Sequence, residues 1–387
     1  MLPYGRQTID EADIAAVVEA LRAPYLTCGP LVGRFEHALA SWLGVEHVSV
    51  CSNGTSALHL AFAALGIGPG DEVITSPITF SATAAAAYYV GATVRFADVD
   101  PATGTLCPRS VESRITHATR AIVPVHLAGQ PADMEPIWRL AAARRLRVIE
   151  DACHAIGASY HGTPIGAGNS DATIFSFHPV KHITTAEGGA VVLREARYKR
   201  RIDRLRQHGI ERDAAQMYAR PEGPGHYEVQ ELGWNYRLSD LQCALGISQL
   251  AKLPEFLRAR GALVATYRTE LARAFPDGGV MPPVELPDRE SAHHLCNVAI
   301  DFPRYATTRE AVVAKLAAAG IGTQVHYVPL IRHPLHAARC PGERLQARPG
   351  VDHYFARTLS LPLYPSLAHA DVTRVVEELR RALGGSP

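Results

Sequence analysis

Short β-rich runs alternate with alanine-rich stretches of helical character between residues 46 and 195. The first of them read HVSVCS, TSALHLAFAALG, DEVITSP, FSATAAAAYYVGA and TVRFADVD, and the rhythm continues to GGAVVLRE. Strands separated by helices of this length pair in parallel, with the helices crossing over the faces of the sheet. This alternation predicts an α/β domain around a mostly parallel sheet of about seven strands.

The pattern becomes helical after residue 195 and predicts a second, smaller domain. Residues 242–275 form the pattern of a long helix, interrupted at Pro254 because proline cannot donate a backbone hydrogen bond inside a helix. Further on, HHLCNVAID and GIGTQVHYVP are typical of strands, and REAVVAKLAAAG and DVTRVVEELRRAL of helices. We expect a large α/β domain with an N-terminal arm over residues 1–250, and a linking helix with a small C-terminal α/β domain over residues 251–387.

The charge and cysteine content narrow the classes of function. The 39 Lys and Arg nearly balance the 38 Asp and Glu, so the chain has no overall field that would attract nucleic acid or an anionic membrane. Its 7 cysteines contain no C-x-x-C pair, and reduced thiols in a cytosol fit this pattern best. No uncharged apolar stretch of about 18 residues occurs, so we predict a soluble, cytoplasmic protein.

Asn53, Gly54, Thr55 and Ser56 stand where the first strand gives way to a helix. The free N–H groups and the positive end of a helix attract an anion there, glycine permits close approach, and the hydroxyls add donors. This pattern is typical of a phosphate site, although taken alone it favours a plain helix cap. A second polar pair, Glu150 and Asp151, ends a buried strand, at the edge where open α/β sheets bind ligands. A carboxylate there could hold a proton on a ring nitrogen or simply cap the next turn.

The stretch from Ser176 to Gly189, SFHPVKHITTAEGG, is the most specific in the chain. Lys181 lies among apolar residues, hydroxyls and a glycine pair, and partial desolvation would lower its pKa and favour the neutral amine that attacks carbonyls. The alternative is an ordinary exposed lysine of a loop. His178 and His182 have the spacing of a metal pair, but Pro179 weakens a helix there and no H-E-x-x-H motif supports them, so we expect no metal.

With these segments together, the chain resembles the sugar aminotransferases of the DegT/DnrJ/EryC1/StrS family, a branch of the fold-type I pyridoxal phosphate (PLP) enzymes. The likeness runs over nearly the whole length and includes PYGRQTIDEADI, SNGTSALHLA, IEDACHAIGA, SFHPVKHITTAEGG, LGWNYRLSDLQCALGISQL and HYVPL. It implies that Lys181 forms a Schiff base with PLP and that Asp151 pairs with the pyridine nitrogen. The other cofactor positions of the family are matched here by Gly54, Thr55, Phe80, His154, Ser176 and Asn235.

The resemblance also gives each of these positions a role. Gly54, Thr55 and Ser176 match residues that hold the cofactor phosphate, Phe80 matches the ring that stacks on the pyridine, and His154 lies near the ring hydroxyl. Asn235 matches a residue that reaches the phosphate of the neighbouring subunit's cofactor, which implies a homodimer with shared active sites. Residues in motifs that face the sugar in relatives are Thr184, Thr185, Glu187, Arg237 and His326. The loop departs from the family pattern, because Ala186 replaces a glycine.

By chemistry alone, Arg6, Arg237 and Arg332 are candidates to bind the diphosphate of a nucleotide.

Some relatives are dehydratases with histidine in place of the Schiff-base lysine, so the presence of Lys181 favours transamination. The chain looks most like the enzymes of pseudaminic acid synthesis, which implies transfer of an amino group from L-glutamate, leaving 2-oxoglutarate, to carbon 4 of UDP-2-acetamido-2,6-dideoxy-β-L-arabino-hexos-4-ulose. Two alternatives remain: an aminotransferase of this family for another UDP-, dTDP- or GDP-keto sugar, and a non-catalytic PLP-binding regulator.

Overall fold

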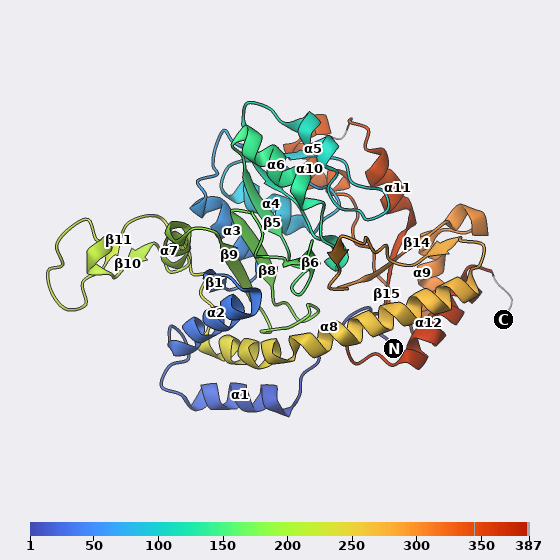
Figure 1. Cartoon of the computed structure of the whole chain (residues 1–387), viewed down its shortest axis with the longest axis horizontal. Coiled ribbons are helices and arrows are strands. Elements are labelled where there is room, and N and C mark those ends of the chain that lie inside the picture. Colours follow the sequence, from blue (N-terminus) through green and yellow to red (C-terminus); the bar gives the residue numbers. More distant parts are fainter. Residues whose placement is uncertain (344, 385–387) are drawn as a thin grey trace.

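A computed structural model describes residues 1–343 and 345–384. Its centre is a seven-stranded sheet, mostly parallel, in which β9 alone runs against its neighbours (Figure 1). The predicted α/β architecture is thus confirmed. In spatial order the strands are β1 (His47–Cys51), β9 (Gly189–Leu193), β8 (Ala172–Ser176), β5 (Arg147–Asp151), β4 (Thr119–Val123), β2 (Glu72–Thr75) and β3 (Thr93–Phe96).

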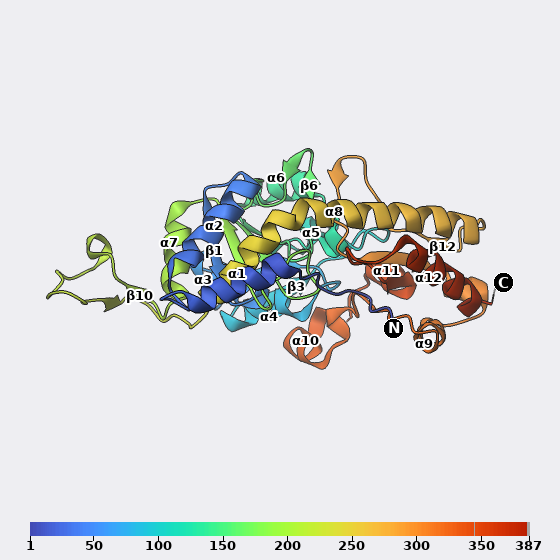
Figure 2. The same ribbon diagram turned by 90° about the horizontal axis from the view of Figure 1, so that it is seen from below.

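Helices cover both faces of this sheet, and an apolar core fills each layer. One face carries α3 (Gly54–Ala64), α4 (Ser81–Tyr89) and α7 (Ala196–Leu205). The other carries α2 (Pro30–Leu43), α5 (Pro108–Arg114) and α6 (Met134–Arg144). Smaller elements at the edges are α1 (Glu11–Arg22), β6 (Ser159–Tyr160), β7 (Thr163–Pro164) and β13 (Arg289–Glu290), and the short hairpin of β10 (Ile210–Glu211) and β11 (Glu228–Val229) extends away from the body (Figures 1 and 2).

The long helix α8 (Asp240–Ala274) joins the two parts of the molecule. Its residues Leu250 to Phe256 pack in the core of the large sheet, and Leu263 to Leu271 pack in the C-terminal core. The expected interruption at Pro254 was wrong: the helix continues through this exposed proline, because the flanking Leu253 and Phe256 are held in the core of the large sheet. The predicted boundary at residue 250 lies inside α8, and we propose a border near Arg260 instead.

The C-terminal part is a small sheet covered by helices, with its own core. Its elements are β12 (Val280–Met281), β14 (Cys296–Ile300), α9 (Arg309–Ala318), α11 (Pro349–Arg357), β15 (Thr358–Leu361) and α12 (His369–Ala382). The short helix α10 (Pro334–Arg339) packs instead against α4, where His336 contacts Tyr88. The strand expected over residues 320–329 was wrong. That segment makes only the isolated bridges of Ile321 to Leu2 and Gln324 to Ser360, and TLSL of β15 takes the place beside β14.

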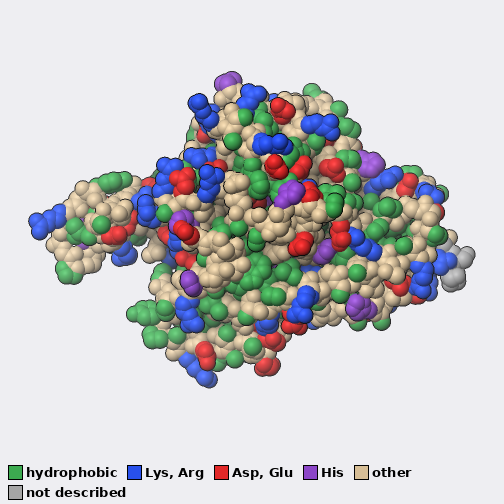
Figure 3. Space-filling view, viewed as in Figure 1, with side chains coloured by type: hydrophobic (Ala, Val, Ile, Leu, Met, Phe, Trp, Pro, Cys, Tyr) green, Lys and Arg blue, Asp and Glu red, His purple; other side chains and the backbone are tan. Residues whose placement is uncertain are grey.

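Charges of both signs are interspersed over the face shown in Figure 3, as the balanced composition predicts. All seven cysteines are unpaired. None of the described helices is both long and apolar enough to cross a membrane, and the described residues contain no group of three or more His, Cys, Asp or Glu placed to hold a metal.

Candidate active site

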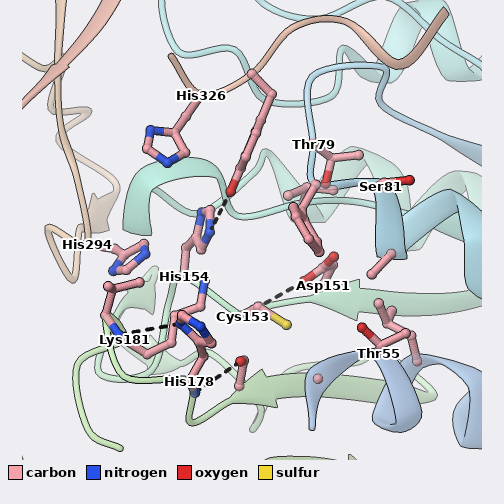
Figure 4. Close-up of a pocket in the computed structure, with 18 of the residues that line it drawn as sticks. Thr55, Thr79, Ser81, Asp151, Cys153, His154, His178, Lys181, His294 and His326 are labelled. Atoms are coloured by element: carbon pink, nitrogen blue, oxygen red, sulfur yellow. Dashed lines mark hydrogen bonds between the residues drawn. The ribbon is translucent and has the colours of Figure 1, made fainter. Parts of the chain in front are cut away.

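A pocket of about 730 Å³ opens beyond the carboxyl ends of the central strands, where the small sheet meets the large one. Its lining comes from the start of α3, the loop between β2 and α4, the ends of β5 and β8, and the segment 324–328 of the C-terminal part. Figure 4 shows Lys181, His154, His178, His294 and His326 in one half of the view and Thr55, Thr79, Ser81 and Asp151 in the other.

The start of α3 forms an anion-binding corner of this pocket. Asn53 caps the helix, accepting from the N–H of Ser56 at 2.8 Å, while the N–H groups of Gly54 and Thr55 belong to the first turn and have no carbonyl within the helix to bind. A Cβ at residue 54 would lie 3.1 Å from the Cβ of Ser176 and 3.2 Å from the sulfur of Cys153. Glycine therefore lets this helix start approach the strand end that carries Ser176.

Asp151 ends β5 and points into the pocket. The hydroxyl of Thr83 donates to its Oδ2 at 2.6 Å, and the N–H of Cys153 donates to Oδ1 at 3.2 Å. Since the proton of Thr83 is used on Asp151, Thr83 accepts from the hydroxyl of Thr79, 2.8 Å away. Glu150 does not line the pocket and is bonded to buried His126 at 2.7 Å. Of the two strand-end carboxylates, Asp151 is thus the one at the pocket.

Lys181 lies in the loop after β8, with its backbone N–H donating to the carbonyl of His178 at 2.9 Å. Its side chain is partly exposed where it lines the pocket. The surrounding protein lowers the pKa of the Lys181 amine by desolvation, against the opposing effects of Cys153 and Asp151. The direction of this pKa shift agrees with the partial desolvation expected from the sequence.

Histidines form the wall beside Lys181. The ring of His154 lies 4.4 Å from that of His294, its Nε2 is 3.2 Å from the hydroxyl of Tyr327, and His182 packs 5.3 Å beyond His294. Burial, followed by nearby positive groups, lowers the pKa of His154, His182 and His294 well below the usual value, so these rings are neutral near pH 7. Neither His294 nor Thr83 was predicted as a site residue from the sequence. The adjacent pair His293–His294 is the only pattern that could have indicated either of them.

These residues fit PLP. The phosphate would bind at Gly54, Thr55 and Ser176, where free N–H groups and a hydroxyl converge, and the carboxylate of Asp151 would meet the ring nitrogen. The fit is supported by the close approach of α3 to β8, which a Cβ at residue 54 would crowd. Lys181 lines the same pocket.

The pocket brings together nine of the residues that the resemblance assigns to the cofactor or the sugar: Gly54, Thr55, Phe80, Asp151, His154, Ser176, Lys181, Glu187 and His326. It does not include the expected sugar-site residues Thr184 and Thr185, because both hydroxyls are used inside the loop, on the carbonyls of Phe177 at 3.0 Å and Glu187 at 2.8 Å.

Four further candidates also lie outside the pocket of their own chain. Arg6 stacks over Tyr364, 5.7 Å from the ring centre, and Arg332 forms an ion pair with Asp352 at 3.0 Å. Asn235 is exposed and Arg237 is partly buried, both just before α8.

The loop at Ala186 keeps a left-handed conformation, with φ of 65°. Alanine in place of the family's glycine therefore strains the backbone at this residue.

Comparison with known proteins agrees with this geometry. The model of the DegT/DnrJ/EryC1/StrS aminotransferase family matches residues 7–380. The spore coat polysaccharide biosynthesis protein SpsC of Bacillus subtilis is 37% identical over 386 residues, which cover 100% of this chain and 98% of SpsC.

Solved structures give the same result. The Helicobacter pylori aminotransferase PseC, involved in the biosynthesis of pseudoaminic acid, superposes with a TM-score of 0.90 at 30% identity over 99% of both chains. The PLP form of Spr1654 from Streptococcus pneumoniae superposes with a TM-score of 0.88 at 27% identity, over 99% of this chain and 98% of that one. The chain therefore belongs to the DegT/DnrJ/EryC1/StrS aminotransferase family, as a sugar aminotransferase whose cofactor is PLP.

Proposed function

We propose that the protein transfers the amino group of L-glutamate to carbon 4 of UDP-2-acetamido-2,6-dideoxy-β-L-arabino-hexos-4-ulose. The observation that carries the reaction is the pocket that holds Lys181, Asp151 and a free helix start together. The choice of sugar is supported by the likeness to PseC, which extends over 99% of both chains. The 37% identity with SpsC favours, as a second candidate, another UDP-, dTDP- or GDP-keto sugar.

The roles of the residues follow from their chemistry. When bound, PLP supplies an electron sink that lets a proton leave the carbon bearing the amino group. Asp151, oriented by Thr83, holds a proton on the ring nitrogen. Lys181, with its lowered pKa, takes the proton from one carbon and returns it at another position. Gly54, Thr55 and Ser176 hold the phosphate.

The walls of the pocket complete the proposed site. Phe80, His154, Glu187 and His326 line the pocket, where the first two would pack against the cofactor ring and the last two would face the sugar. Among the described residues that line the pocket, Lys181 is the only Lys or Arg. The cofactor phosphate, the nucleotide diphosphate and the carboxylates of glutamate are all negatively charged, and charged partners bind them most strongly. One chain therefore leaves the site short of positive charge.

We therefore propose a homodimer with shared active sites. Asn235 of the partner subunit would reach the cofactor phosphate, and Arg237 of the partner subunit the substrate. Large exposed apolar side chains support this assembly: Phe80 is 60% exposed beside the pocket, and Leu232, three residues before Asn235, is 91% exposed.

The test uses the visible absorbance of the PLP-loaded enzyme. Glutamate should bleach the band of the wild type, and the proposed UDP-keto sugar should restore it. The Lys181→Ala variant should lose this response, and Lys315→Ala, outside the pocket, should keep it. A wild type that glutamate leaves unchanged would be a non-catalytic PLP-binding protein. A wild type that glutamate bleaches, but that only a dTDP- or GDP-keto sugar restores, would establish the second candidate.

A further inference from the structure

His326 enters the pocket from the C-terminal part of the chain and is almost fully buried. Its Nδ1 lies 2.7 Å from the hydroxyl of Ser360 on β15. Its Nε2 makes no hydrogen bond to any residue that the structure describes, although the ring lines the pocket next to Tyr4, 5.6 Å away between ring centres. One nitrogen is therefore engaged by the protein and the other is left for a ligand.

Behind His326 the hydrogen bonds continue in a chain. The pairing of β14 with β15 places Asn297 opposite Ser360. The Ser360 hydroxyl is 2.6 Å from Oδ1 of Asn297, Nδ2 of Asn297 is 2.9 Å from the hydroxyl of Tyr354, and that hydroxyl lies 3.4 Å from the carbonyl of His326 itself. The network returns to the residue from which it starts.

The amide of Asn297 sets the direction of each bond, because its oxygen only accepts and its nitrogen only donates, and the distances agree with this orientation. At 2.6 Å, the Ser360–Asn297 contact is shorter than the usual range of an N–H donor and typical of an O–H donor, whereas 2.9 Å suits an N–H donor from Asn297 to Tyr354. Ser360 has one proton and spends it on Asn297, so it can only accept from His326. The proton of His326 is therefore on Nδ1, and Nε2 carries a lone pair.

We propose that Ser360, Asn297 and Tyr354 are positioning residues that fix this tautomer, so that Nε2 of His326 accepts a hydrogen bond from a hydroxyl of the sugar substrate. The inference rests on the proposed function for the identity of the substrate, and on the network alone for the tautomer. Burial, followed by the charge of Lys181, lowers the pKa of His326 to about 4, so the ring stays neutral in the working range.

The chemistry of an acceptor explains the choice of a hydroxyl. A neutral lone pair attracts O–H groups and repels carboxylates, which have only acceptor oxygens at neutral pH. Glutamate and 2-oxoglutarate present two carboxylates each, and the amino group of glutamate is the one that reacts at the cofactor, whereas the ring of the proposed keto sugar presents a hydroxyl on carbon 3. A fixed acceptor therefore distinguishes the two substrates that share this pocket.

Neutron diffraction from deuterium-exchanged crystals of the PLP-loaded enzyme reads the tautomer without any turnover. We expect deuterium on Nδ1 of His326 and none on Nε2. Deuterium on Nε2 would overturn the proposal, whatever substrate the enzyme uses.

The second measurement separates the two half-reactions in a Ser360→Ala variant. We expect the bleaching by glutamate to stay within about twofold of wild type, and kcat/KM for the UDP-keto sugar to fall about tenfold, as expected for one hydrogen bond. The matched control is Thr323→Val, since the Thr323 hydroxyl is buried without a partner among the described residues. An equal loss in both half-reactions would overturn the specificity role. If glutamate fails to bleach the wild type, the proposed function fails, and the neutron result still decides the tautomer.

Discussion

At the scale of single residues, the carboxylate of Asp151 depends on a hydroxyl from a different element. Thr83 of α4 donates to it at 2.6 Å, in the buried interior. We expect Thr83→Val to weaken PLP binding about tenfold, because a hydrogen bond to a charged group contributes about 1.5 kcal/mol and valine leaves the carboxylate free to rotate. Spectrophotometric titration of the apoenzyme with PLP measures this.

A matched control for that substitution is available in β2, the strand that precedes α4. Thr75 is also buried, but its hydroxyl donates to the carbonyl of Val123 at 2.8 Å, outside the pocket. Thr75→Val should cost stability and leave PLP affinity unchanged. Equal affinities of wild type and Thr83→Val would show that Thr83 has no part in orienting Asp151.

The backbone conformation of a second residue, Ala186, affects the stability of the protein. It has a φ of 65°, a conformation that costs a residue with a Cβ about 1 kcal/mol relative to glycine. We expect Ala186→Gly to raise the free energy of unfolding by about 1 kcal/mol, seen as a higher urea midpoint at unchanged slope. The same change at exposed Ala314 within α9 should lower it by about 1 kcal/mol, so equal signs at both sites would contradict this account.

At the scale of elements, α8 carries a proline that its packing overrides. Pro254 leaves the carbonyl of Leu250 without its helical donor, yet the helix runs on to Ala274. Because Pro254 is exposed, alanine there restores the bond without losing core contacts, and we expect Pro254→Ala to stabilise the protein by about 2 kcal/mol in urea unfolding. Pro30→Ala, at the first turn of α2 where no helical bond is lost, should give no such gain.

The elements also show which features a sequence can reveal. The parallel sheet and its ligand edge were predictable, because the alternation of strand and helix patterns is local. The segment around Gln324 has a strand pattern, but whether it or TLSL pairs with β14 depends on contacts distant in sequence. Thr83 lies 68 residues from Asp151, and nothing in its alanine-rich helix signals that partner. The polar groups that orient the site were therefore the part that sequence patterns could not supply.

At the scale of the whole molecule, buried neutral histidines couple stability to pH. Burial lowers the pKa of His154, His182, His294 and His326 in the folded protein, whereas in the unfolded chain each has a pKa of about 6.5. Below that pH the unfolded chain binds protons that the folded protein does not, so stability is complete above it and is lost as pH falls. Each histidine contributes a slope approaching about 1.4 kcal/mol per pH unit.

We therefore expect the urea midpoint of the PLP-loaded enzyme to be flat between about pH 7 and 8 and to fall steeply from about pH 6.5 to 5. Replacing His294 by Gln removes one of these protons. The slope of the free energy of unfolding against pH should therefore decrease by about 1.4 kcal/mol per pH unit in the lower range, while the upper range stays flat. If the slopes of the two proteins were the same, His294 would be protonated in the folded state. The inference that the histidines beside Lys181 are neutral would then be wrong.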